Sequence, residues 1–144
     1  MITRITRFLS TDQPQLADMG LAIRTEVFVR GQHVDPSLEY EHEEEAHHYL
    51  LFLEDKPVAT ARWRETAKGI KLERFATLPD YRNKGFGSEL LKEILKDVAS
   101  SGNCIYLHSQ LLAVPFYEKF NFLKEGDLFR EADIDHFLMI YRQR

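Results

Sequence analysis

The feature that most constrains this chain of 144 residues is segment 79–88, which contains two glycines and separates a strand-like run from a helix-like run. Residues 70–78 alternate apolar and polar side chains, as a strand with one buried face does. Residues 90–98 carry apolar side chains at helical spacing. Gly85 and Gly87 let the backbone approach a ligand, and the unpaired N–H groups of the first helical turn favour an anion. The segment therefore predicts a phosphate-binding turn between a strand and a helix.

Two common phosphate-binding loops do not match this segment. A Walker loop requires a lysine and a serine or threonine directly after its second glycine, whereas Ser88 and Glu89 follow Gly87 here. A dinucleotide-binding loop requires a small residue at its third glycine position, which is Leu90 in this chain. It also requires an acidic residue about 20 positions further on to bind ribose. The pattern that remains is arginine, two residues, glycine, one residue and glycine, starting at Arg82.

This pattern, preceded by a strand and followed by a helix, resembles the coenzyme-A-binding loop of the GNAT acetyltransferase superfamily. Residues 110–122 resemble the other signature of the superfamily, in both order and distance from the glycine loop. Gln110 occupies the usual asparagine position in that signature. Asn121 replaces the usual glycine, and asparagine is the next best residue for a left-handed turn at a helix end. Together the two motifs cover residues 70–122.

Within the superfamily, residues 26–32, which read Glu-Val-Phe-Val-Arg-Gly-Gln, resemble the bacterial ElaA/YjcF-like branch. Residues 46–50 and the segment around Gln110 point to the same branch. The branch does not define an acceptor, so the resemblance leaves the acceptor amine open. A sugar phosphate would require a further basic cluster outside the coenzyme loop, and none stands out in the sequence.

The resemblance implies one N-acetyltransferase domain over residues 1–144 with the GNAT fold, of the α/β (α+β) class. This fold is a mixed central β-sheet of about six to seven strands flanked by about four helices, in which a splayed pair of parallel strands holds the cofactor. The hydrophobic pattern gives a compatible order of elements. Strands are expected at residues 1–9, 49–53, 57–63, 70–78, 104–108, 122–129 and 136–142. Helices are expected around residues 16–28, 90–98 and 112–119.

The resemblance also implies that the cosubstrate is acetyl-CoA. The strand before the glycine loop is expected to offer its backbone at Phe75, Ala76 and Thr77 to pantetheine, and a backbone N–H there to bind the acetyl oxygen. Gln110 is assigned to the coenzyme as well, and it is also expected to line the acceptor site. The residues expected around the pyrophosphate are Arg82, Asn83, Lys84, Gly85, Phe86, Gly87 and Ser88.

Acetyl transfer from a thioester to an amine needs a neutral amine, a stabilised oxyanion and protonation of the departing thiolate. Tyr117 occupies the position of the family's tyrosine near the coenzyme sulfur. A phenol with a pKa of about 10 can donate to a thiolate whose conjugate acid has a pKa of about 8.5. The alternative is that Tyr117 packs the short helix onto the sheet, beside Phe116 and Phe120.

Glu73 is the first candidate for the general base, because it is expected on the same strand face as Phe75, near where many members of the family that the chain resembles place a carboxylate. The alternative is an exposed strand residue that pairs with Arg74 or Arg62. His108, at the end of the following strand, ranks below Glu73, because a lone strand histidine is more often structural. A base that acts through water is left open.

Composition fits one folded domain and limits its partners. Hydrophobic residues make up 44% of the chain and aromatic residues 12%, which argues against disorder. The net charge of −4 disfavours nucleic acid as a partner. No apolar run has the length of a membrane helix and the N-terminus lacks a signal-peptide core, so no membrane partner and a cytoplasmic location are expected. The expected partner is an amine acceptor, either a small molecule or a peptide, and a homodimer is left open.

The single cysteine, Cys104, excludes an intrachain disulfide and fits a reducing compartment. It is expected in a strand beside Ile105 as a small core residue, and therefore not as an acetyl carrier. The function expected is an acetyl-CoA-dependent N-acetyltransferase that acts by direct transfer in a ternary complex. The competing hypothesis is a non-catalytic acyl-CoA-binding or regulatory domain, and Tyr117 argues against it.

Residues 39–48 contain five glutamates and three histidines, and this density invites a metal-site interpretation. No motif spacing supports a defined site, and the chemistry of the family needs no metal, so none is expected. The favoured interpretation is a solvated acidic loop. A third alternative is that the loop borders the acceptor pocket, where negative charge attracts a cationic amine.

Overall fold

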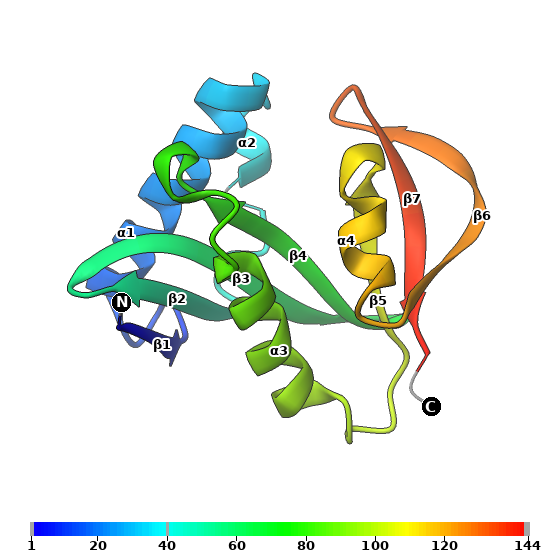
Figure 1. Ribbon diagram of the computed structural model, residues 1–144, viewed down its shortest axis with the longest axis horizontal. Helices are drawn as coiled ribbons and strands as arrows, with labels where there is room; N and C mark the ends of the chain where they lie inside the picture. The colour runs from blue at the N-terminus through cyan, green and yellow to red at the C-terminus, as the bar shows by residue number, and fades with distance from the viewer. Residues whose placement is uncertain (1, 40, 143–144) are drawn as a thin grey trace.

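The computed structural model describes residues 2–39 and 41–142; Met1, Tyr40 of the acidic segment, Gln143 and Arg144 lie outside them. Within these residues, seven strands form one sheet with helices on both faces (Figure 1). The strands are β1 (Thr3–Phe8), β2 (His47–Leu53), β3 (Lys56–Thr66), β4 (Gly69–Thr77), β5 (Ile105–Gln110), β6 (Phe122–Glu131) and β7 (Ile134–Tyr141). The helices are α1 (Pro14–Arg24), α2 (Pro36–Glu39), α3 (Phe86–Val98) and α4 (Val114–Glu118). Short helical segments are η1 (Thr25–Arg30), η2 (Pro79–Tyr81) and η3 (Leu111–Ala113), of which η1 is a π-helix.

The strand order is β1-β2-β3-β4-β5-β7-β6. Among the described residues β4 and β5 are the one parallel pair, and every other neighbouring pair is antiparallel. This mixed sheet with four α-helices confirms the fold class predicted from the sequence. None of the helices within the described ranges is long and apolar enough to cross a membrane.

Two hydrophobic cores lie on opposite faces of the sheet. On one face α3 buries Leu90, Leu91, Ile94 and Val98, which its amphipathic sequence places on one side, and α4 adds Tyr117. On the other face α1 and η1 pack their apolar side chains against β1, β2 and β4. Figure 1 shows α3 crossing the strands of the larger part of the sheet, while α4 lies over β5. Helices therefore cover both faces of the sheet at β4.

The parallel strands β4 and β5 pair over a short stretch only. Their register joins Ile70 to Ile105 and Leu72 to Leu107, and no later pairs follow although both strands continue. Beyond Leu72 the two strands diverge, as Figure 1 shows. The predicted splayed pair is thus present, and it opens toward the C-terminal ends of both strands.

A β-bulge in β4 changes which side chains share a face. Arg74 has a φ of 59°, and three steps along β4 from Glu73 to Ala76 correspond to two steps along β3. Phe75 therefore turns toward Tyr117, on the α3 and α4 face, while Glu73 turns toward Arg62 on the opposite face. The expectation that Glu73 and Phe75 share a strand face is wrong, because strict alternation does not hold through a bulge.

The start of β5 corrects the prediction for Cys104. This residue is exposed, because β5 begins at Ile105 and Cys104 ends the loop that follows α3. Its carbonyl accepts a hydrogen bond from the Ile70 N–H at 2.7 Å. Gly69 has a φ of 144°, and a Cβ there would lie 2.2 Å from the same carbonyl oxygen, so this junction requires glycine.

Candidate active site

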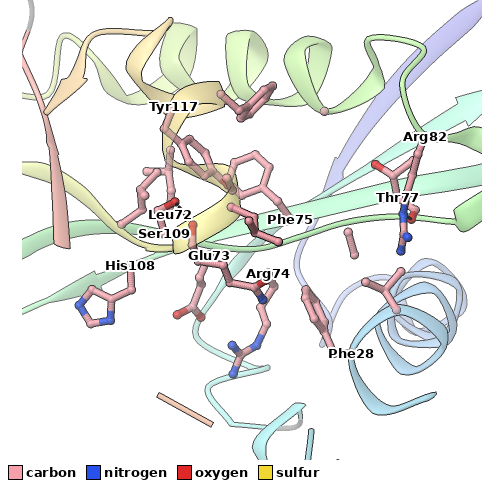
Figure 2. Close-up of a pocket in the computed structure, with 18 of the residues that line it drawn as sticks. Phe28, Leu72, Glu73, Arg74, Phe75, Thr77, Arg82, His108, Ser109 and Tyr117 are labelled. Atoms are coloured by element: carbon pink, nitrogen blue, oxygen red, sulfur yellow. Dashed lines mark hydrogen bonds between the residues drawn. The ribbon is translucent and has the colours of Figure 1, made fainter. Parts of the chain in front are cut away.

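A cavity of about 910 Å³ opens where β4 and β5 diverge. Its walls come from η1, β4, the loop before α3, the first turn of α3, β5, α4 and the β6–β7 hairpin. Figure 2 shows Tyr117 on one side of the strands and the side chains of Glu73, Arg74 and His108 on the other. The sequence-predicted residues that line it are Glu73, Phe75, Ala76, Thr77, Arg82, Asn83, Gly85, Phe86, Gly87, Ser88, His108, Gln110 and Tyr117. Lys84 is the exception, since it is exposed and outside the lining.

The glycine loop reaches α3 through two left-handed residues. Asn83 has a φ of 63°, and Gly85, the N-cap of α3, has a φ of 85°. The helix begins at Phe86, which lines the cavity and is almost fully buried in the core. Arg82 donates from Nε to the Thr77 carbonyl at 3.2 Å, which ties the loop to the end of β4. The loop thus aims the unpaired N–H groups of a helix start at the cavity.

Tyr117 lies at the edge of the cavity with its ring packed among aromatic side chains. Its ring centroid is 5.8 Å from Phe75, 5.1 Å from Phe116 and 5.9 Å from Phe122, each in an edge-to-face arrangement. Burial raises the pKa of Tyr117 above its ordinary value. The phenol is therefore protonated at neutral pH and held in a fixed orientation.

Glu73 lies on the opposite face and is surrounded by cations. Its carboxylate contacts Arg62 at 2.6 Å, Arg64 at 3.1 Å and Lys71 at 3.6 Å. Burial alone would raise the pKa of the Glu73 carboxyl, but the charges of Arg62, Arg64, Arg74 and Lys71 together lower it below its ordinary value. A basic cluster thus gathers from β3 and β4, with Glu73 at its centre. The alternative that Glu73 pairs with Arg62 is confirmed, although the carboxylate is buried and not exposed.

The acidic segment contributes a second carboxylate, that of Glu43, to this charge network. The Glu43 carboxylate bonds Arg24 at 2.7 Å and Arg62 at 3.1 Å, and both arginines are almost fully buried. Arg62 also donates to the Glu41 carbonyl at 2.7 Å, and His48 Nε2 lies 2.9 Å from the Glu43 carbonyl. The interpretation of a solvated loop is wrong for Glu43, because its carboxylate holds two buried guanidinium groups.

Within the described residues, no group of three or more His, Cys, Asp or Glu side chains comes together as a metal site would require. His42 instead pairs with Glu45 on the surface, outside the cavity. His47 stacks on the Trp63 ring with centroids 3.9 Å apart. The histidines of the acidic segment therefore have separate partners.

The β6–β7 hairpin brings two residues to the cavity that the sequence did not single out, Glu131 and His136. His108 Nδ1 lies 3.1 Å from Glu131 Oε1, and His136 Nε2 lies 3.7 Å from Glu131 Oε2. The hydrogen bond from His108 lowers the pKa of Glu131 to about 2. Nothing in the local sequence marks Glu131, since its position depends on the pairing of β6 with β7 and of β7 with β5.

Gln110 ends β5 at the boundary between the sheet and η1. Its side-chain amide makes reciprocal hydrogen bonds with Gln32, at 2.9 Å and 3.1 Å. Gln32 also lines the cavity, as do Val27 and Phe28 of η1. The amide of Gln110 is thus directed toward η1, on the face that also carries His108.

A family model described as an acetyltransferase (GNAT) domain matches residues 11–143. The N-acetyltransferase YjcF of Bacillus subtilis is 35% identical over 136 residues, which cover 92% of this chain and 96% of the relative. The crystal structure of Escherichia coli ElaA has a TM-score of 0.86 and 22% identity, with 96% of this chain and 99% of that chain covered. An aminoglycoside 6'-N-acetyltransferase complexed with coenzyme A has a TM-score of 0.76 and 20% identity, with coverage of 100% and 99%. The two structures share the fold.

Proposed function

The chain belongs to the GNAT acetyltransferase family, and we propose that it transfers the acetyl group of acetyl-CoA directly to a primary amine in a ternary complex. The predicted resemblance to this family and to its ElaA/YjcF-like branch is confirmed, and the chain is an acyltransferase. The finer points are our proposals: acetyl-CoA as donor, an amine of a small molecule or peptide as acceptor, and a cytoplasmic site of action for one domain over residues 1–144.

One observation carries the proposal. A single cavity joins the helix start at Gly85 and Gly87, the open backbone edge of β4 and the protonated Tyr117 hydroxyl. Those are the three groups that a thioester donor needs: donors for its pyrophosphate, a strand edge for its pantetheine and an acid for its thiolate. The same cavity extends to β5 and the β6–β7 hairpin, where we place the acceptor.

The chemistry assigned to each group follows from its surroundings. The amine attacks the thioester carbonyl, and a backbone N–H of residues 75–77 on β4 stabilises the oxyanion. The C–S bond then breaks, and the hydroxyl of Tyr117 protonates the thiolate. Cys104 takes no part, since it lies before the N-terminal end of β5 and is not among the residues that line the cavity.

The test is a thiol-release assay with acetyl-CoA and a panel of amines: ethanolamine, spermidine, glucosamine, lysine and glycyl-alanine. Turnover with at least one member, together with mass-spectrometric detection of its N-acetyl product, is the expected result. Coenzyme A binding in calorimetry without thiol release for any member would favour a non-catalytic acyl-CoA-binding domain. The absence of coenzyme A binding would overturn the proposal.

A further inference from the structure

Two carboxylates and two histidines lie on the acceptor side of the cavity, where a proton must leave the incoming ammonium group. They are Glu73 on β4, Glu131 at the end of β6, His108 on β5 and His136 on β7. We propose that His108, oriented by Glu131, accepts the proton of the acceptor amine, and that Glu73 serves as the anion of a structural charge network. This assignment rests on the proposed function, since it concerns the amine of the same reaction.

Glu73 is poorly placed to act as a base. Its Oε2 already accepts hydrogen bonds from Arg62 at 2.7 Å and Arg64 at 3.1 Å, and Lys71 approaches Oε1. A carboxylate that three cations stabilise holds a proton weakly. The difference in pKa between it and the ammonium group that it would have to deprotonate is therefore larger. Its protonation would also leave the fully buried Arg62 with less of its counter-charge. Glu73 therefore stabilises β3 and β4, and it does so best when it stays ionised.

His108 has the opposite properties. Its Nδ1 lies 3.1 Å from the Glu131 carboxylate, which can only accept, so Nδ1 is the donor in this pair and Nε2 is the nitrogen left for the acceptor amine. The ring is partly exposed in the cavity and is held by the edge of Phe129, with centroids 5.1 Å apart, and by Tyr106 at 6.0 Å. An imidazole with one nitrogen oriented by a carboxylate is an arrangement that general bases use.

The position of His108 follows from the sheet. Lys71 pairs with Tyr106, so the next residues on the same face of the two strands are Glu73 and His108. The strands diverge at this level, and the two side chains flank the opening from its two edges. Figure 2 shows both on the side away from Tyr117. The acid and the base thus approach the reacting carbon from opposite faces of the sheet.

Glu131 is held by the tight hairpin that follows it. Ala132 and Asp133 both have positive φ values, and Arg130 donates to the Asp133 carbonyl at 2.5 Å. The second carboxylate oxygen faces His136 Nε2 at 3.7 Å, while His136 Nδ1 donates to the Ile134 carbonyl. The titratable groups around His108 are therefore Glu131 on β6, His136 on β7, Tyr106 on its own strand, and Lys71 and Glu73 on β4. Glu131 is the one bonded to its ring.

The proton balance of the step is complete without another reactant. The ammonium group gives one proton to His108 Nε2, and the imidazolium that forms is stabilised by Glu131 and later releases its proton to solvent. The neutral nitrogen then forms the N–C bond, and the C–S bond breaks. Tyr117 donates its proton to the thiolate, and the nitrogen then loses its second proton, which reprotonates Tyr117. The products are an N-acetyl amine, coenzyme A with a free thiol and one proton in solvent.

The experiment compares His108→Gln with wild type, using the most active alkylamine of the panel and hydroxylamine as two acceptor probes. Hydroxylamine is already unprotonated at neutral pH, so it does not need the first deprotonation. We expect kcat/KM to fall about 100-fold or more for the alkylamine and less than about tenfold for hydroxylamine. His42→Gln is the matched control, because it removes a histidine–carboxylate pair outside the cavity. His42→Gln should leave kcat/KM unchanged for both the alkylamine and hydroxylamine.

Glu131→Gln tests the orienting role. We expect kcat to fall about tenfold for the alkylamine and to change little for hydroxylamine, because the His108 ring loses the carboxylate that orients it. Coenzyme A affinity in calorimetry should match wild type for all three variants, which separates a folding defect from a catalytic one. Equal losses with both probes, or an unchanged His108→Gln enzyme, would overturn the assignment. A wild-type enzyme that acetylates no amine would overturn the proposed function itself.

Discussion

The two ends of the cavity are built by different means. On the proposed function, the phosphate-binding part of the coenzyme end comes from one continuous segment, residues 82–88, and relies on backbone: two left-handed residues and the first turn of α3. The acceptor end comes from η1, β4, β5 and the β6–β7 hairpin, and it relies on charged side chains that partner one another. A backbone site binds a constant group and leaves a sequence motif, whereas a side-chain site depends on strand register and can differ from one relative to the next.

The sharpest way to test this difference is to block the coenzyme end alone. Gly87→Val places a branched side chain on the backbone that faces the cavity, while a Cβ at this position meets only Phe116, at 3.7 Å. We therefore expect a folded protein whose coenzyme A affinity, measured by calorimetry, is about 1,000-fold weaker, or roughly 4 kcal/mol. Gly87→Ala is the control and should lose much less. Coenzyme A binding by the valine variant with near-normal affinity would mean that the loop does not contact the pyrophosphate.

A substitution at the acceptor end should lower the stability of the folded protein. Glu73→Gln leaves Arg62 buried with less counter-charge, so we expect the free energy of unfolding at neutral pH to fall by about 3 kcal/mol. The folded-state pKa of Glu73 is lowered, so its contribution is present above the unfolded value of about 4.3 and is lost as pH falls through the folded value. Urea denaturation from pH 7 downward should show a flatter acid dependence for the variant.

The same variant separates the two roles considered for Glu73. If this residue were the general base, the kcat/KM profile of Glu73→Gln would lose its acidic limb. We expect the limb to remain, with the loss confined to stability. Circular dichroism at the assay temperature shows whether the rates refer to folded protein.

Tyr117→Phe tests the chemistry at the coenzyme end. The ring keeps its packing against Phe75 and Phe122, so coenzyme A affinity should stay within about twofold of wild type. Loss of the acid should lower kcat about 100-fold. Steady-state kinetics and calorimetry on the same preparation give both values. An unchanged kcat would show that Tyr117 only packs against its neighbours and is not the acid.

The smallest effect is expected where the two ends meet. Gln110 was assigned to the coenzyme from its place in the motif, yet its amide bonds Gln32 beside η1. We expect Gln110→Ala to raise the KM for the amine about fivefold, the loss of roughly one hydrogen bond, and to leave coenzyme A affinity unchanged. A weaker affinity for coenzyme A with an unchanged KM for the amine would indicate instead that Gln110 contacts the coenzyme.

The fold was predictable because its signals are local: alternation in β4, helical spacing in α3 and a glycine turn between them. Asn121 is a similar case, since its predicted left-handed conformation is confirmed by a φ of 69°. The face of Glu73 was not predictable, because the bulge at Arg74 depends on how β4 pairs with β3. Glu131 was missed for the same reason, since its approach to His108 depends on the pairing of three strands. Cys104 was expected to be part of β5, but this strand begins one residue later, at Ile105.

The short pairing of β4 with β5 has a mechanical consequence. The sheet of seven strands is joined across its middle only by residues 70–72 and 105–107, so it consists of two panels, of four and three strands, that meet along a short seam. On the proposed function, pantetheine lies along that seam and supplies the contacts that a further stretch of strand would otherwise make. A bound coenzyme would then join the two panels beyond Leu72, where β4 and β5 no longer pair.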